Sequence, residues 1–286
     1  MKKSISSILI LAGIVVASPS QAQLLKKIQN AAAQGVENAA TKRARDASEK
    51  KTNDAIDGMI GGMIKPAPTE SEYAFTGYMV MEVRNTDKKG RSEDPVKMQY
   101  LLSDNLEFMG MSFADPKSPE NSTTSIIDTK NEAIVMLMEN KGEKSSMAIR
   151  IDHEKMQGMV DKEVEKQREN PEYKITKTGN TKTILGYQCE EYLITSEDGE
   201  GHYWVTEKPI EGLSLFSPQS NPMVSNKTMD QYSSMFSNAP KGSFLEMIFT
   251  DKKGTVTEMK VIEIETNSPR KYNMDDFPNM MAGAGK

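Results

Sequence analysis

Apolar and polar residues alternate along the chain from Tyr73 onward, and this period of two restricts the fold more than any other feature of the sequence. At its start, Tyr73, Phe75 and Met79 fall on one face, and Thr76 and Glu82 fall on the other. Such alternation predicts a strand with one buried face. Similar segments follow at 96–102, 106–113, 123–128, 133–139, 145–151, 173–178, 183–185, 189–196, 202–206, 244–250 and 255–266. Short turns separate most of them, which favours a meander of antiparallel strands.

The tetrapeptide Asp-Lys-Lys-Gly occurs twice, at 87–90 and at 251–254, each time after a predicted strand. Aspartate in the first position and glycine in the fourth suit a type I turn that continues into a hairpin. The flanking sequences differ, so the two copies do not indicate an internal repeat.

Two segments interrupt the alternation. Residues 152–169 carry an apolar stripe at helical spacing, with Asp152 as a potential N-cap and Pro171 as the stop, and 223–236 predict a second short helix. The domain 73–272 is therefore predicted to be mostly β (α+β). We expect a curved antiparallel sheet or incomplete barrel with one or two covering helices.

The first 22 residues predict a secretory signal peptide. Lys2 and Lys3 precede an apolar run at 8–17, and small residues ending at Ala22 form a cleavage site. No later stretch approaches the ~20 apolar residues of a membrane-spanning helix, so we expect no transmembrane segment in the mature chain. Cys189 is the only cysteine, which excludes an internal disulfide and favours a bacterial periplasm over a eukaryotic exterior. The expected location is the periplasm or outer-membrane periphery of a Gram-negative-type bacterium.

Residues 23–65 predict a helical extension rich in Ala, Lys, Gln and Glu. Its apolar stripe is narrow, so two interpretations stand: a solvated spacer that folds back on the domain, or a helix that binds a protein partner. A linker at 66–72 contains two prolines, and 273–286 show no period and predict a flexible tail.

Composition argues against several kinds of function. The net charge is −5, which disfavours nucleic-acid binding. His153 and His202 belong to no zinc-binding pattern, and nucleotide-binding and serine-hydrolase motifs are missing from the sequence. Cys189 with His202 is the one conceivable nucleophile–base pair, and no feature indicates the oxyanion hole it would need. We predict a protein that is not an enzyme and uses no cofactor or metal.

Methionine is unusually frequent, with 21 residues. Three predicted strands each place two thioethers on one face. Flexible filling of the core is the favoured explanation, followed by an adaptable ligand cavity and then by Cu(I) coordination. The residues predicted to line such a cavity are Phe75, Met79, Met81, Met109, Met111, Met136, Met138 and Trp204.

Residues 179–192 read G-x-T-K-x-I-x-G-Y-x-C-x-x-Y, and a strand containing Trp204 follows. This pattern resembles an uncharacterised family of secreted bacterial proteins and, more widely, the LolA/LolB-like periplasmic lipoprotein carriers. The resemblance implies a concave sheet around an apolar cavity suited to an acyl chain, and it transfers no catalytic residues. The motif positions Gly179, Gly186, Tyr187, Cys189, Tyr192 and Trp204 are predicted to be structural, with a bend at Gly186 and a buried thiol at Cys189.

These observations predict an exported protein that binds a hydrophobic or lipidic ligand in a concave β-sheet. The alternative is an envelope scaffold or interaction protein that acts through residues 23–65. Methionine-based Cu(I) handling is the third possibility.

Overall fold

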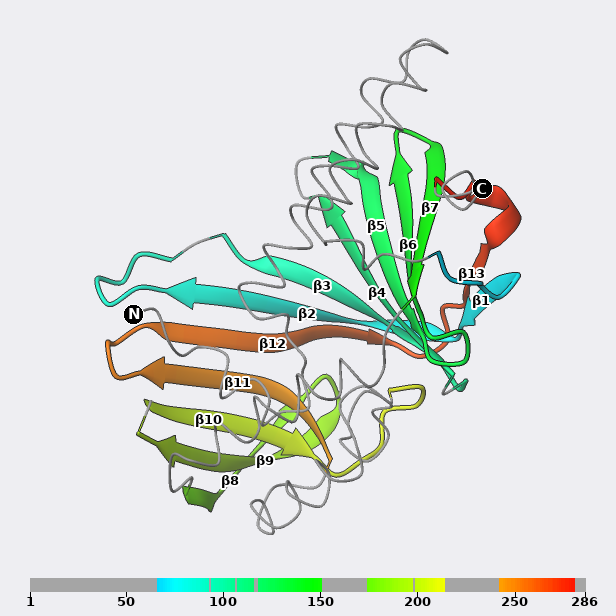
Figure 1. The fold of residues 1–286 in the computed structure, drawn as a ribbon. Helices are drawn as coiled ribbons and strands as arrows, with labels where there is room; N and C mark the ends of the chain where they lie inside the picture. The colour runs from blue at the N-terminus through cyan, green and yellow to red at the C-terminus, as the bar shows by residue number, and fades with distance from the viewer. Residues whose placement is uncertain are drawn as a thin grey trace.

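Eleven antiparallel strands form one continuous open sheet (Figure 1). The computed structural model describes residues 66–92, 94–105, 107–115, 118–150, 174–197, 199–213 and 242–280. The predicted signal peptide, the extension at 23–65 and the helices at 152–169 and 223–236 lie outside the described residues. The strand order is β7-β6-β5-β4-β3-β2-β12-β11-β10-β9-β8. The strands are β2 (Gly77–Thr86), β3 (Val96–Leu102), β4 (Phe108–Asp115), β5 (Ser118–Asp128), β6 (Ala133–Asn140), β7 (Glu143–Arg150), β8 (Lys174–Ile184), β9 (Tyr187–Ser196), β10 (Gly199–Thr206), β11 (Ser243–Asp251) and β12 (Val256–Glu265).

The predicted antiparallel meander is confirmed, with two differences. The expected strands at 173–178 and 183–185 are one strand, β8, because an irregularity between Lys177 and Thr181 lets the backbone continue past Gly179. The expected strand that starts at Tyr73 is broken at Thr76. Its first part, β1 (Glu72–Phe75), leaves the large sheet and pairs with β13 (Arg270–Asn273).

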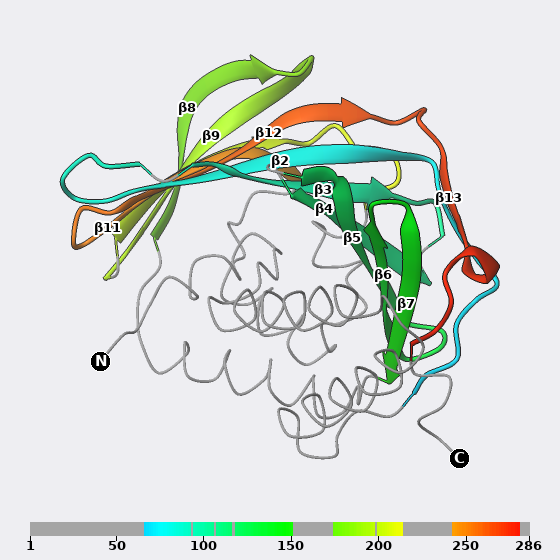
Figure 2. The ribbon, with the colours of Figure 1, turned by 90° about the horizontal axis from the view of Figure 1, so that it is seen from above.

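The sheet is strongly bent (Figure 2). Strands β5, β6 and β7 turn away from the direction of β2 and β12, and the β1–β13 ribbon lies on the outer side of the bend. Tyr73 and Phe75 of the ribbon make edge-to-face contacts with Phe108 at 5.3 and 5.4 Å between ring centroids. A Cβ on Gly110 would lie 2.7 Å from the Phe75 ring, so a larger residue there would force the ring to shift. The face under the ribbon is called the outer face below, and the opposite one the inner face.

The chain after Asn273 does not form the loose tail that the sequence predicts. A short 3₁₀ helix, η2 (Met274–Asp276), follows β13, and Phe277 is buried in the same cluster as Tyr73 and Phe75. Residues 278–280 then run along β7, where the Ser146 amide donates to the Pro278 carbonyl at 2.9 Å. They shield part of an edge strand that would otherwise be open to pairing. Residues 281–286 lie outside the described part of the chain.

Both Asp-Lys-Lys-Gly segments form the predicted hairpin turns. In each, the glycine amide donates to the aspartate carbonyl, at 2.8 Å for Gly90 and 2.9 Å for Gly254. The aspartate carboxylates also accept bonds from backbone amides, at 2.8 Å from Lys89 and 2.8 Å from Lys253. Both glycines have positive φ, which explains their place at the end of the turn.

Candidate functional site

A row of side chains crosses the inner face from β2 to β7. The strand register aligns Met79 with Tyr100, Tyr100 with Met111, Met111 with Ser125, Ser125 with Met136, and Met136 with Met147. Because neighbouring strands lie about 4.8 Å apart, this row spans about 24 Å. Only the Ser125 position is polar, so the row is an almost continuous apolar band.

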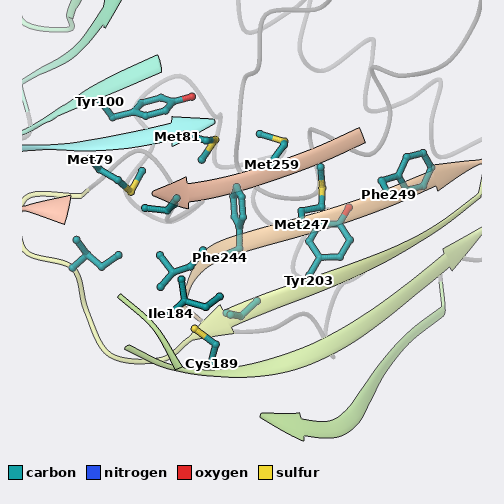
Figure 3. Close-up of a cluster of buried hydrophobic side chains, with 14 of the residues drawn as sticks. Met79, Met81, Tyr100, Ile184, Cys189, Tyr203, Phe244, Met247, Phe249 and Met259 are labelled. Carbon is teal, nitrogen blue, oxygen red and sulfur yellow. The ribbon is translucent and has the colours of Figure 1, made fainter. Parts of the chain in front are cut away.

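A second row crosses the other half of the sheet and meets β2 at Val83, four residues along the strand from Met79. It aligns Val83 with Met259, Met259 with Met247, Met247 with Tyr203, and Tyr203 with Tyr192. Figure 3 shows the buried cluster in which three of these side chains lie. Burial raises the pKa of the Tyr100 hydroxyl in this cluster.

Parts of the inner face remain accessible. Met98 and Met111 are only half-buried, and Val96, which pairs with Val83 at the end of β3, is 57% exposed. By contrast, Met79 and Met81 are fully buried. Accessibility therefore increases along β3 from Tyr100 toward Val96.

The structure brings six of the eight residues predicted to line a cavity onto this one face. They are Met79, Met81, Met109, Met111, Met136 and Met138. Phe75 lies in the outer-face cluster because β1 has left the sheet. Trp204 lies on the outer face as well, since it pairs with Glu246 next to the inner-face Tyr203, and the Lys182 ammonium sits 4.0 Å from its ring centroid.

The motif residues occupy structural positions. Leu185 and Gly186, both with positive φ, form the two-residue turn between β8 and β9, which confirms the predicted bend. Gly179, also with positive φ, lies at the irregularity in β8. Tyr187 begins β9 and Tyr192 ends the second inner-face row. Cys189 is buried, as predicted, and burial raises the pKa of its thiol.

Cys189 and His202 do not form a pair. His202 lies opposite Leu193, four residues along β9 from Cys189. Its Nδ1 is 2.8 Å from the carboxylate of Glu191 instead. The nucleophile–base arrangement that the sequence allowed is therefore not built.

Glu191 is the centre of a polar network that the sequence does not predict. Its carboxylate accepts 2.7 Å bonds from the Thr178 hydroxyl and the Asn180 amide, besides its contact with His202. Burial alone would raise the pKa of Glu191, but these hydrogen bonds outweigh it and hold the pKa below its usual value. Thr178 and Asn180 flank Gly179, so the irregularity in β8 is what brings them to the carboxylate. No local sequence pattern marks this contact between three strands.

A second buried carboxylate, Asp128, ties the ribbon to the sheet. It accepts 2.7 Å bonds from the Tyr73 hydroxyl and from the Asn131 side-chain amide. Burial and the hydrogen bond to Asp128 raise the pKa of the Tyr73 hydroxyl. Because the Tyr73 hydroxyl and the Asp128 carboxylate are hydrogen-bonded to each other, we infer that this network stabilises the fold.

The outer face over β2, β11 and β12 carries a polar depression of about 280 Å³. It is lined by Glu82, Arg84, Glu246, Ile248, Glu258, Met259 and Lys260. Charges of both signs line it, so the outer face is polar over these three strands, whereas under the β1–β13 ribbon it is apolar.

Within the described residues, no three His, Cys, Asp or Glu side chains come close enough to share a metal ion. In the described part of the chain, no helix is long and apolar enough to span a membrane.

The fold and the site define an open antiparallel β-sheet protein whose inner face carries an apolar band. The chain belongs to the family of the domain of unknown function DUF4412, which matches residues 75–276. The match starts in β1 and ends in η2, so it includes the whole sheet. A relation to the LolA/LolB-like carriers stays a prediction.

Three solved structures resemble parts of this one. PNGF-II is 13% identical over 71% of this chain and 31% of its own, with a TM-score of 0.27, so this chain spans about a third of that protein. The lipoprotein LppX of Mycobacterium tuberculosis is 8% identical over 68% of this chain and 88% of its own, with a TM-score of 0.25. The β-barrel-like DUF1849 protein of Brucella abortus is 7% identical over 67% of this chain and 98% of its own, with a TM-score of 0.23. These scores are too low to carry an argument about function. No curated protein matches the chain.

Proposed function

We propose that this protein binds a hydrophobic ligand of the acyl-lipid type on the inner face of its sheet, as an exported and non-enzymatic component of the cell envelope. The observation that carries the proposal is the apolar band that crosses the sheet from Met79 to Met147 on the inner side of the bend. Export rests on the predicted signal peptide.

The chemistry of the band favours an adaptable ligand. Methionine has three rotatable bonds and a polarisable sulfur, so a surface rich in it can repack around different apolar partners. The band is about 24 Å long, which is comparable with an extended acyl chain, and its buried ends lie on either side of the half-buried Met111. Half-buried Met98 and Met111 and exposed Val96 give a ligand a place to enter.

The test compares neighbouring residues on opposite faces of β3. Met98→Gln places an amide on the inner face, and Lys97→Gln makes the matched change on the outer face. Uptake of a fluorescent fatty-acid probe is titrated in both variants and in the unchanged protein. Because burying an unbonded amide costs about 1–3 kcal/mol, we expect Met98→Gln to weaken probe binding about tenfold. Lys97→Gln should leave it unchanged.

Native mass spectrometry of the purified exported protein supplies the second measurement. Co-purifying lipid that delipidation removes and that can be added back supports the proposal. An apo mass together with no probe uptake by the delipidated protein would overturn it, as would equal binding losses in the two variants.

A further inference from the structure

Four methionines meet where β7 forms the edge of the sheet. Met136 and Met147 are directly opposite each other on β6 and β7, and Met138 lies two residues further along the same face of β6. These three are the buried members of one cluster, exposed by 2%, 2% and 8% for Met136, Met147 and Met138, and Met280 packs against them. In the larger inner-face cluster, methionines are instead mixed with aromatic and aliphatic side chains.

The fourth methionine arrives from a distant part of the chain. The Met280 amide donates to the Ser146 carbonyl at 2.9 Å, and Asn279 pairs with Ser146 in a parallel bridge. Because Ser146 faces Asn279, the next residues on each segment, Met147 and Met280, share the opposite face. Met136, Met147 and Met280 therefore form a row across three adjacent backbone segments.

The four methionines offer thioether sulfurs, which are soft ligands for a metal ion. Thioethers bind Cu(I) in preference to hard cations such as Mg²⁺ and Ca²⁺. The apolar neighbours of the cluster are Ile134 and Ile149. Ser125 lies opposite Met136, and Thr123 and Ser145 lie opposite Met138, but neutral hydroxyls are hard donors that Cu(I) does not prefer. Directly opposed strand residues have Cβ atoms about 4.5–5.5 Å apart, which lets two flexible thioethers converge on one ion.

We propose that Met136, Met138, Met147 and Met280 form a binding site for a single Cu(I) ion with sulfur ligands alone. Met280, at the sheet edge and only partly buried, is the residue that an incoming ion meets first. The site shares Met136 and Met147 with the β7 end of the apolar band and lies away from the half-buried region around Met98 that the acyl ligand would enter. Binding of a metal ion goes beyond the proposed function.

Anaerobic titration of the whole exported protein against a chromophoric Cu(I) chelator tests the stoichiometry. We expect one equivalent of Cu(I) to be withdrawn from the chelator by the unchanged protein and none by Met136→Leu/Met147→Leu/Met280→Leu. Leucine keeps the volume and apolar character of methionine, so the fold should persist, which circular dichroism checks. The matched control, Met81→Leu/Met247→Leu/Met259→Leu, removes three inner-face thioethers elsewhere and should retain the uptake.

A residue-level measurement uses Ag(I), a redox-inert soft ion, with methyl-¹³C methionine NMR. Shifts confined to the four assigned methyl groups support the site. Shifts spread evenly over all methionines, or Cu(I) uptake retained by the cluster variant, would overturn it. Met98→Gln, which weakens probe binding and lies outside the methionine cluster, should keep the full Cu(I) uptake, so failure of the copper site and failure of lipid binding can be told apart.

Discussion

At the scale of single residues, Glu191 gives the clearest link between contacts and stability. It is 7% exposed, and its carboxylate accepts hydrogen bonds from Thr178 and Asn180 and contacts His202. A group whose pKa is lowered in the folded protein stabilises it above the unfolded pKa, near 4.5 for glutamate, and loses that contribution as the pH falls through the folded pKa.

Glu191→Gln should therefore destabilise the protein by about 1–3 kcal/mol at pH 7, and the difference should shrink as the pH falls below about 4.5. Urea unfolding at several pH values measures this. Glu190→Gln is the control, because Glu190 forms a partly exposed ion pair with Lys177 and its loss should cost about 0.5 kcal/mol or less. A pH-independent difference for Glu191→Gln would contradict the assigned role.

At the scale of elements, two-residue hairpin turns illustrate how local conformation constrains sequence. Lys141-Gly142 joins β6 to β7 and Leu185-Gly186 joins β8 to β9, all with positive φ. Asparagine suits the first position of such a turn, whereas leucine is strained there. Leu185 is also 46% exposed.

We predict that Leu185→Asn stabilises the protein by about 1 kcal/mol, measured as a rise in the unfolding midpoint in urea. Leu185→Gln removes the exposed apolar side chain without the preference for positive φ, so it should give a smaller gain. Equal gains in stability from both substitutions would mean that removing the exposed leucine, and not relieving the backbone strain at positive φ, causes the effect.

The element predictions succeeded where the information is local. Alternation located the strands, and Asp-Lys-Lys-Gly located two turns. The break at Thr76 was missed because the alternation continues through it without a change of phase. Only the structure reveals that the Thr76 amide donates to the Leu102 carbonyl and that the Thr76 carbonyl accepts from the Ser268 amide. These two hydrogen bonds fix the backbone at the point where β1 leaves the sheet.

At the scale of the whole molecule, the C-terminal segment is part of the fold. Phe277 is 6% exposed and contacts the aromatic cluster formed with Tyr73 and Phe75, and its carbonyl accepts a 2.8 Å bond from the Ser146 hydroxyl. Residues more than 100 positions apart therefore stabilise the same layer.

Phe277→Ala should cost about 3 kcal/mol of stability, the usual range for a buried phenylalanine, in thermal or urea unfolding. Phe277→Leu, which fills most of the space, should cost clearly less. A neutral Phe277→Ala would instead favour the loose tail that the sequence predicts.

The sequence by itself determined the period of each strand, the turns and the pairing of methionines on single strands, because these depend on residues close together in the chain. The relation between strands came from the tertiary structure, since register decides which faces become neighbours. Register placed six predicted methionines on one face and added Met147, and the bridge between Ser146 and Asn279 added Met280. It also placed Trp204 on the other side, because its neighbours Tyr203 and Val205 occupy the inner face. Long-range pairing thus turned separate apolar stripes into one surface.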